Sequence, residues 1–380
     1  MESKATIKGV AEATNHFGMN LYKILAKENT NVFFSPFSLS TAVAMLFCGA
    51  QNETAEEMRE VLGCEAANIK DEELKFCFQK PLDALGGKRA YYTLECANAL
   101  VIHKEFPAKD EYKSLLKDNF KALLREADFV NETVEAVELV NEWVKMKTSS
   151  MIPKSLDSLD PEAVLIILNA VYFKGLWLDP FKQQYTYLQD FYNKGGKNNC
   201  PREVDMMHIT ETFPYTKQES YKALELPYKG RDISMLILLP DSEDGLSELE
   251  NSLSSTFIKD VKQSMSSTEV RVALPRFQLE YSKSLKEAFQ SLGLNRVFRS
   301  GAHLNGINDS DELFLSGVNH KAVLVVNEAG TEATAVTYEV LTGCSTTMEY
   351  EKFIVDHPFM FAIYTARENL ILFMGRVVEL

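Results

Sequence analysis

The chain has 380 residues, of which 46% are hydrophobic, so it is long enough to bury a large core. Its formal net charge is −14 at pH 7. This excess of acidic residues disfavours binding to nucleic acid or to an anionic membrane surface, because both need basic patches. Length alone would suggest two or three domains, but no linker or low-complexity segment divides the chain.

Three segments have the pattern of α-helices. Apolar residues recur at helical spacing over residues 10–24, which predicts a helix with one apolar face. Residues 41–48 predict a buried helix, with Ser38 or Ser40 as its N-cap. Residues 136–147 predict a surface helix with one apolar face.

Three further segments have the pattern of buried strands. Residues 164–173 are rich in aliphatic and aromatic side chains, as in a strand covered on both faces. Residues 234–239 predict a second buried strand, which ends at Pro240, and residues 370–373 predict a third. Helices and strands follow no repeated unit, so the predicted fold class is α+β.

The chain has six cysteines, and none forms a CxxC pair or lies at metal-ligand spacing from a histidine. We therefore expect no metal site. Free thiols indicate a reducing compartment, and residues 1–6 contain no apolar signal core. The longest apolar run, residues 163–173, is too short to span a bilayer. These observations predict a cytoplasmic protein; a secreted one stays open if a signal was removed or secretion is unconventional.

Residues 325–337 combine two patterns that rarely coincide. Every second residue from Thr331 is small, namely Thr331, Ala333, Ala335 and Thr337. In a strand these side chains would share one face, and a sheet interior could accept that face. Residues 343–347 follow and have the composition of an exposed loop. A segment that fits both an exposed loop and an inserted strand is a candidate conformational switch.

The block Glu328-Ala329-Gly330-Thr331-Glu332-Ala333-Thr334-Ala335 is similar to the hinge of the inhibitory serpins, a family of suicide-substrate protease inhibitors. Six other segments resemble further motifs of the same family. They are residues 31–38 (NVFFSPFS), 169–177 (NAVYFKGLW), 274–277 (LPRF) with 356–359 (DHPF), 319–324 (NHKAVL) and 373–378 (FMGRVV). The resemblance extends over most of the chain and is strongest to the intracellular, ovalbumin-like inhibitory branch.

The resemblance implies a fold and a set of sites. The fold is a single serpin domain over residues 1–380, with three β-sheets, about eight or nine helices and an exposed reactive-centre loop at about residues 328–354. The implied hinge comprises Glu328, Gly330, Thr331, Ala333 and Ala335. The implied "shutter", a polar cluster beneath the central sheet, comprises Ser35, Ser38, Asn169 and His320. Trp177 falls in the region called the breach.

The resemblance also implies a mechanism. A protease cleaves the loop and forms an acyl-enzyme, and the freed hinge then inserts into the central sheet and distorts the protease. Small inward residues favour insertion, because overpacking a core costs about 1–3 kcal/mol. Glu339, the next inward position, departs from this pattern, and we expect it near the far end of the inserted strand, within reach of solvent.

Family spacing from Gly330 predicts the reactive bond between Cys344 and Ser345. No Lys or Arg occurs from Gly330 to Glu351, which disfavours trypsin-like targets and favours chymotrypsin-like or elastase-like proteases. Papain-like cysteine proteases are the alternative. They would prefer the bond between Thr342 and Gly343, with Leu341 as the residue that they recognise.

We expect no enzyme, because the sequence has no nucleophile elbow, no Walker motif and no glycine-rich dinucleotide turn. One other function class remains open beside inhibition. A non-inhibitory binding or chaperone role on the same fold would leave the loop unable to insert. We expect a monomer without cofactor. We expect no heparin-type partner, because the basic run at residues 75–80 is flanked by acids and reads as a solvated helix edge.

Overall fold

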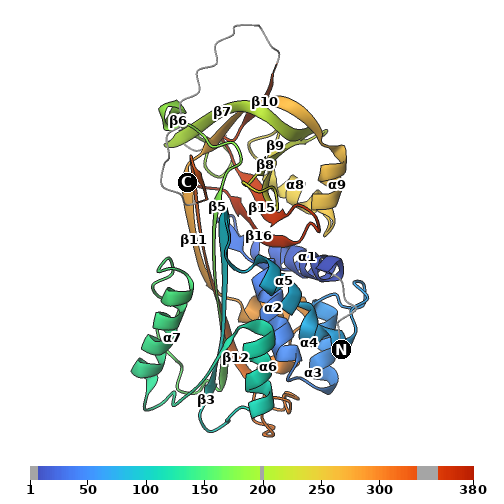
Figure 1. The fold of residues 1–380 in the computed structure, drawn as a ribbon, viewed down its shortest axis with the longest axis vertical. Coiled ribbons are helices and arrows are strands. Elements are labelled where there is room, and N and C mark those ends of the chain that lie inside the picture. Colours follow the sequence, from blue (N-terminus) through green and yellow to red (C-terminus); the bar gives the residue numbers. More distant parts are fainter. Residues whose placement is uncertain (1–6, 197–200, 332–349) are drawn as a thin grey trace.

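The computed structural model describes residues 7–196, 201–331 and 350–380. Long strands run down one side of an elongated molecule, and most helices lie on the other side (Figure 1). The α-helices of the described residues are α1 (Ile7–Leu25), α2 (Pro36–Phe47), α3 (Asn52–Val61), α4 (Asp71–Cys77), α5 (Gln79–Leu85), α6 (Asp110–Phe120), α7 (Thr133–Lys147), α8 (Leu246–Ser252), α9 (Phe257–Ser264) and α10 (Lys286–Leu292).

The described strands form two hydrogen-bonded sheets. The first has seven strands in the order β11-β12-β13-β5-β3-β2, and β4 also pairs with β3. Its strands are β2 (Gly87–Lys88), β3 (Tyr92–His103), β4 (Leu123–Ala127), β5 (Leu165–Leu176), β11 (Phe277–Ser284), β12 (Leu315–Asn327) and β13 (Gly330–Thr331). The central pair, β12 and β5, is parallel. This sheet contains the candidate site.

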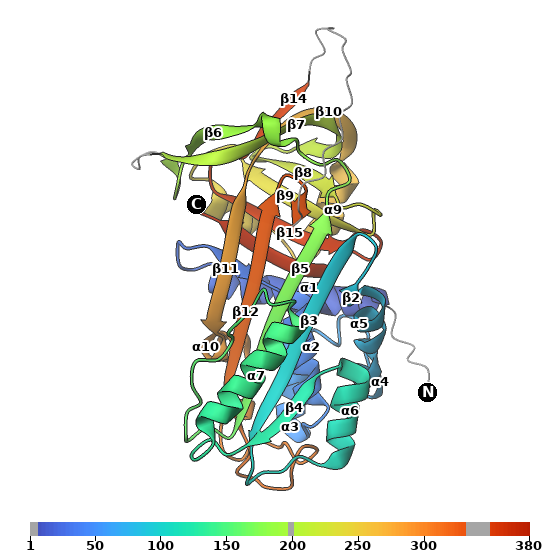
Figure 2. The same ribbon diagram turned by 60° about the vertical axis from the view of Figure 1, so that its left-hand side comes forward.

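Both faces of the seven-stranded sheet are covered. Along β5, Ile167 and Phe173 enter the large core that α1 and α2 share. Ile166 and Leu168 enter a smaller core beneath α7, and Figure 2 shows α7 lying across this sheet. Because alternate side chains reach opposite faces, burial on both sides explains why the β5 sequence is apolar almost throughout.

The second sheet has nine strands in the order β1-β16-β15-β9-β8-β7-β10-β14, and β6 also pairs with β7. Its strands are β1 (Val32–Phe34), β6 (Thr186–Phe191), β7 (Arg202–Lys217), β8 (Tyr221–Pro227), β9 (Ile233–Pro240), β10 (Ser266–Pro275), β14 (Glu351–Ile354), β15 (Phe359–Thr365) and β16 (Ile371–Val377). The long strand β7 pairs with β6 and β10 along most of its length, and its last three residues pair with β8. Two of the three expected sheets are thus joined through β7.

The predicted helices and strands are present, with one correction. The helix predicted at residues 41–48 is α2, but it begins at Pro36, and its N-cap is Ser35 rather than Ser38 or Ser40. Ser35 Oγ accepts a hydrogen bond from the Ser38 backbone N–H at 3.1 Å. Proline fits the first helical position, where a backbone N–H would lack a partner, and this moves the start of the helix.

The helix count depends on one residue. Phe78 alone separates α4 from α5, and its backbone has helical angles (φ −78°, ψ −21°). Counted as one bent helix, α4 and α5 bring the described α-helices within the predicted number.

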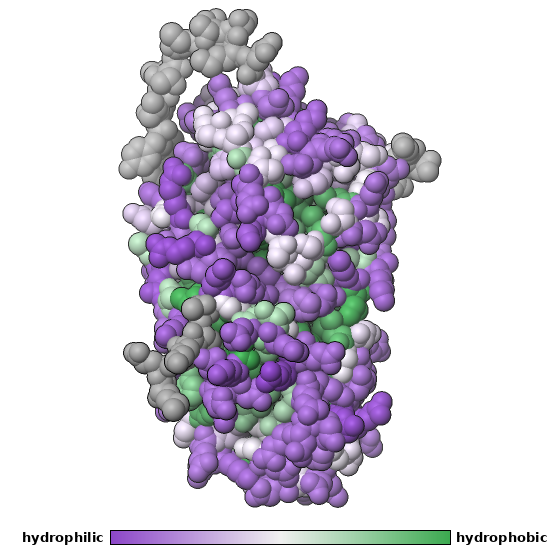
Figure 3. All heavy atoms as spheres, turned by 90° about the vertical axis from the view of Figure 1, so that its right-hand side faces the viewer, coloured by the Kyte–Doolittle hydropathy of each residue, from purple (hydrophilic) through white to green (hydrophobic). Residues whose placement is uncertain are grey.

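The helix-rich side of the molecule is mainly hydrophilic, with smaller apolar areas between polar side chains (Figure 3). Among the described residues, no helix combines the length and the apolar character needed to cross a bilayer.

Candidate functional site at the opening of the seven-stranded sheet

The strand β13 forms a short wedge between β12 and β5. Thr331 pairs with Val326 on β12 and with Gly175 on β5. Below the wedge, β12 and β5 pair directly with each other, from Val323–Tyr172 downwards. The sheet is therefore open at the ends of these two strands, which lie at the top of the sheet in Figure 2, and closed beneath.

Gly330 fits this wedge because it has no side chain. Its φ is +152°, which L-residues rarely adopt. A Cβ atom at this position would lie 2.0 Å from the Gly175 carbonyl oxygen and 2.8 Å from Leu176 Cα. Any other residue would push β13 away from β5.

Thr331 is fully buried and anchored by an aromatic pair. Its Oγ1 lies 2.7 Å from the Tyr228 hydroxyl oxygen. The Tyr228 ring stacks on Trp177 with a centroid distance of 4.5 Å and an interplanar angle of 14°. Trp177 Nε1 in turn donates a hydrogen bond to the Asn327 carbonyl at 3.0 Å. The indole thus holds the end of β12 and the wedge together.

Glu328 connects the wedge to the other sheet. Its side chain is only 9% exposed, and its Oε1 accepts a hydrogen bond from Thr186 Oγ1 at 2.9 Å. Arg276 Nη1 lies 3.7 Å from the same oxygen and also pairs with Asp205. A buried carboxylate needs such partners, so Glu328 ties the hinge to β6 and to the turn between β10 and β11.

A buried polar network crosses the sheet further down. Asn98, Asn169 and His320 lie side by side on β3, β5 and β12, in direct register. His320 Nδ1 donates to Asn169 Oδ1 at 2.6 Å, and Asn169 Nδ2 donates to Asn98 Oδ1 at 2.5 Å and to Ser38 Oγ at 2.6 Å. This network joins all three strands to α2.

The network is electrically neutral and incompletely satisfied. Burial lowers the pKa of His320 to about 3, so the imidazole is uncharged near pH 7. Its Nε2 and the Asn98 Nδ2 have no hydrogen-bond partner among the described residues. Two unpaired buried atoms, on the two strands that flank β5, are a local cost, which a different arrangement of the sheet could remove.

The structure brings the predicted shutter residues together in part. Ser38, Asn169 and His320 share one network. Ser35 instead caps α2 and donates to the Leu372 carbonyl on β16 at 2.6 Å. Among the predicted hinge and breach residues, Glu328, Gly330, Thr331 and Trp177 lie at the wedge. Outside the described residues lie Ala333, Ala335, Leu341, Thr342, Gly343, Cys344 and Ser345.

Sequence reasoning missed four residues of the site: Asn98, Thr186, Tyr228 and Arg276. A polar residue inside an apolar strand was a usable signal for Asn98, because such a residue needs a buried partner. Arg276 lies in one of the family-like blocks but received no role. Nothing in the local sequence marks Thr186 or Tyr228, since their partners lie more than a hundred residues away.

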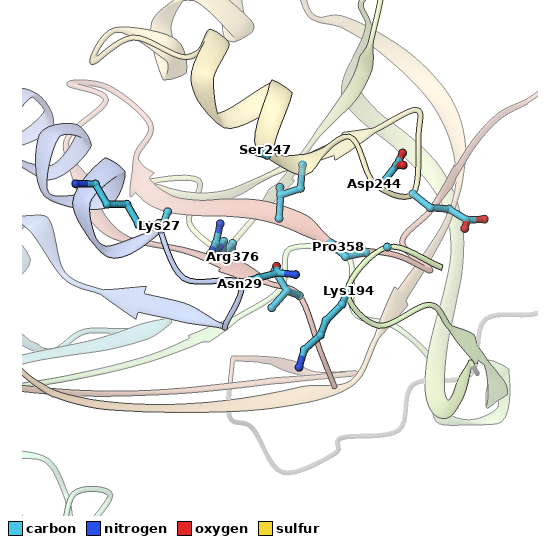
Figure 4. Close-up of a pocket in the computed structure, with 12 residues that line it drawn as sticks. Lys27, Asn29, Lys194, Asp244, Ser247, Pro358 and Arg376 are labelled. Carbon is cyan, nitrogen blue, oxygen red and sulfur yellow. The ribbon is translucent and has the colours of Figure 1, made fainter. Parts of the chain in front are cut away.

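A small pocket lies away from this site, between the end of α1 and the start of α8 (Figure 4). Lys27, Lys194 and Arg376 line it together with Glu243 and Asp244. Arg376 is already bound to both oxygens of Glu250. The mixed charges and the engaged arginine give the pocket no evident ligand. Among the described residues, no group of His, Cys, Asp and Glu could hold a metal ion.

Comparison with known proteins identifies the family. Residues 12–380 match the family described as Serpin (serine protease inhibitor). The chain belongs to the serpin family. Serpins are, as a family, inhibitors of proteases rather than catalysts.

Relatives of this serpin come from arthropods, among other sources. It is 39% identical to intracellular coagulation inhibitor 1 of Tachypleus tridentatus, over 98% of this chain and 89% of that protein. It is 38% identical to Iripin-2 of Ixodes ricinus, over 98% of this chain and 94% of that protein.

Solved serpin structures have the same fold. Uncleaved ovalbumin superimposes with a TM-score of 0.88 at 27% identity, covering 98% of this chain and all of that chain. Serpin48 of the insect Tenebrio molitor, described as highly specific, superimposes with a TM-score of 0.84 at 31% identity, covering 98% of both chains. The serpin fold of this chain, α+β in a single domain, follows from these matches.

Proposed function

We propose that this serpin inhibits a protease irreversibly, as a suicide substrate, through a reactive-centre loop at residues 328–354. The protease nucleophile attacks the carbonyl carbon of Cys344. The peptide bond to Ser345 breaks, and the new amine takes up the proton that the nucleophile gave up. The residues after Thr331 then insert between β12 and β5. The observation that carries the proposal is the position of β13, which already lies between these two strands.

Extending the β13 register gives the neighbours of each inserted residue. Each step of two residues along the loop moves two residues back along both β12 and β5. The neighbours are Leu324 and Phe173 for Ala333, Ala322 and Val171 for Ala335, and His320 and Asn169 for Thr337. All of these neighbours are buried. Small loop side chains on this face can therefore enter without overpacking the core.

Thr337 would enter at the polar network. Insertion there parts His320 from Asn169, which are now joined by a 2.6 Å hydrogen bond. A threonine hydroxyl can both donate and accept a hydrogen bond, so it can satisfy the groups that insertion separates. The network thus supports both the closed and the inserted sheet.

The energy available from insertion is large enough for the task. A new strand adds on the order of ten backbone hydrogen bonds, each worth about 1 kcal/mol. The sum is comparable with the whole stability of a domain, about 5–15 kcal/mol. Insertion coupled to the acyl-enzyme could therefore disorder a protease active site.

Glu339 is the one inward residue that opposes full insertion. The same register puts position 339 between Val318 and Ile167, both of which are fully buried. Because both neighbours are buried, solvent would not reach Glu339 in this register, contrary to the expectation from the sequence. An ionised carboxylate between apolar side chains is costly, so we infer that insertion slows before this residue.

The target class follows from Cys344. A side chain of medium size without positive charge suits chymotrypsin-like or elastase-like pockets. A papain-like cysteine protease that cuts between Thr342 and Gly343 is the alternative. An intracellular site of action is supported by the names of two relatives, intracellular coagulation inhibitors 1 and 2, and by four free cysteines, Cys48, Cys64, Cys77 and Cys96.

A protease panel tests the proposal. The intact protein is incubated with serine and cysteine proteases, and the products are separated on denaturing gels. We expect a covalent complex that resists denaturant with at least one protease that is not trypsin-like. Cleaved protein without any complex across the panel would contradict inhibition and favour a binding or chaperone role. Melting before and after loop cleavage is the control, since insertion should raise the melting temperature.

A further inference from the structure

Exposed aromatic side chains gather on the part of the nine-stranded sheet where the reactive-loop segment ends. Tyr350 is the first described residue after this segment and is 39% exposed, and Tyr187 on β6 is 46% exposed. Together with His208, Arg271 and Lys352 they form what we call the aromatic–cationic row. Figures 1 and 2 both show β6, β7 and β10 forming the upper end of the molecule.

Strand register puts the row on one face. Arg271 on β10 lies opposite Lys352 on β14. Ala273, two residues further along β10, lies opposite His208 on β7. Tyr350 and Lys352 are two residues apart and so share that face. The other face is the core side, where Phe353 is fully buried and Glu351 Oε2 accepts a hydrogen bond from the Tyr215 hydroxyl.

Four members of the row, Tyr187, His208, Arg271 and Tyr350, interact with one another. The Tyr187 ring stacks on the His208 ring at 4.4 Å with an interplanar angle of 3°. His208 Nε2 lies 3.1 Å from Gln189 Oε1 on β6. The Arg271 guanidinium forms side-chain hydrogen bonds with Tyr350 and Tyr187, which raise the pKa of Arg271. Side chains that are already ordered lose little entropy when a partner binds.

The row also carries two cations, Arg271 and Lys352, on an acidic protein, with one carboxylate, Glu269, two residues from Arg271 on the same face of β10. The chain carries a net charge of −14. Within the described part of the chain, neither Arg271 nor Lys352 forms an ion pair with a carboxylate. Such a surface attracts an acidic partner at close range, although the protein as a whole repels one.

Chain length brings the reactive bond close to this row. Cys344 and Tyr350 are six residues apart, and six extended residues span at most about 20 Å. Even a small domain is about 30 Å across. A protease that holds Cys344 in its cleft therefore has surface within reach of Tyr350 and Arg271, whatever path the intervening residues take.

We propose that the aromatic–cationic row is an accessory docking surface for the target protease, and that it binds an acidic and partly apolar area beside the protease's substrate cleft. The inference rests on the proposed inhibitory function and adds a determinant of partner choice outside the loop. Aromatic residues and arginine dominate the binding energy of many interfaces. The row selects among proteases that would cut the loop equally well.

The test uses the protease that forms a complex in the panel. Second-order rates of complex formation are measured for the intact wild type and for Tyr187→Ala and Arg271→Gln. We expect each variant to be slower by on the order of tenfold. The number of inhibitor molecules consumed per protease should stay unchanged, because docking precedes the choice between trapping and release. Salt should slow the wild type more than Arg271→Gln.

The control variant is Tyr91→Ala, since Tyr91 is 43% exposed and also lies near a cation, the Lys229 ammonium. It should react like the wild type. The rate at which the protease cuts a free peptide with the loop sequence measures its preference for the loop alone. Melting temperatures equal to that of the wild type show that the variants are folded. Wild-type rates for both row variants would overturn the docking surface and leave the proposed function intact. No complex with the wild type would instead overturn the proposed function, and the docking surface with it.

Discussion

The hydroxyl groups of Thr331 and Tyr228 lie 2.7 Å apart, and both residues are buried. The last described residue before the loop is therefore already seated in the sheet, with its side chain in a polar contact. Insertion would continue a strand that has begun, rather than start a new one. The intact molecule has therefore already formed the first strand pairing that insertion requires.

Thr331→Arg should convert the inhibitor into a substrate. The guanidinium would have to occupy the space beside Tyr228 without a charged partner, and burying an unpaired charge costs several kcal/mol, about 3–5. The loop should still be cut at a rate similar to wild type, while the yield of covalent complex falls by on the order of tenfold or more. Thr331→Ser, which keeps the hydroxyl, should retain most of the complex. Full complex yield from Thr331→Arg would rule out insertion at this position.

Cys344→Arg should create inhibition of trypsin-like proteases. No Lys or Arg occurs from Gly330 to Glu351, so the new arginine would be the single basic choice in the loop. Melting should stay at the wild-type temperature, since the substitution lies in the loop. Sequencing the peptide released from the wild-type complex checks the site independently. An N-terminus at Ser345 supports this bond, whereas one at Gly343 would move it and favour a papain-like target.

Acid should loosen the closed sheet through His320. The pKa of the buried imidazole is lowered to about 3, against about 6.5 for an exposed histidine. The native state therefore has the full benefit of a neutral His320 above about pH 6.5, and loses it progressively as the pH falls towards 3. Urea midpoints at pH 7 and pH 5 should differ less for His320→Gln than for the wild type. His16→Gln is the control, and an equal pH dependence in all three proteins would contradict the assignment.

Glu339→Ala should speed loop insertion and raise the melting temperature of the cleaved form. The substitution removes a carboxylate from a position that faces Val318 and Ile167 in the extended register. Glu339→Gln separates charge from size and should give an intermediate result. Identical melting temperatures for the three cleaved proteins would mean that the inserted strand stops before this residue or follows another register.

The sequence predicted more of the fold than of the site. Long apolar segments such as residues 164–173 and 234–239 appear as β5 and β9. They could be predicted because nearly every residue in them is apolar, so their own composition indicates burial. The cap of α2 was misplaced because Pro36 starts the helix earlier than its apolar run. Tyr228 and Arg276 could not be predicted as partners of Thr331 and Glu328, since side-chain pairing across strands depends on how the sheets meet.

The ladder between β12 and β5 closes directly beneath the wedge. These two strands must part before the loop can go further, and the closed form persists for as long as they stay together. Under the proposed insertion mechanism, the lifetime of the intact protein is set kinetically, by the rate at which this ladder opens. Its durability should be described by a half-life at each temperature, and the apparent melting point should rise with the heating rate.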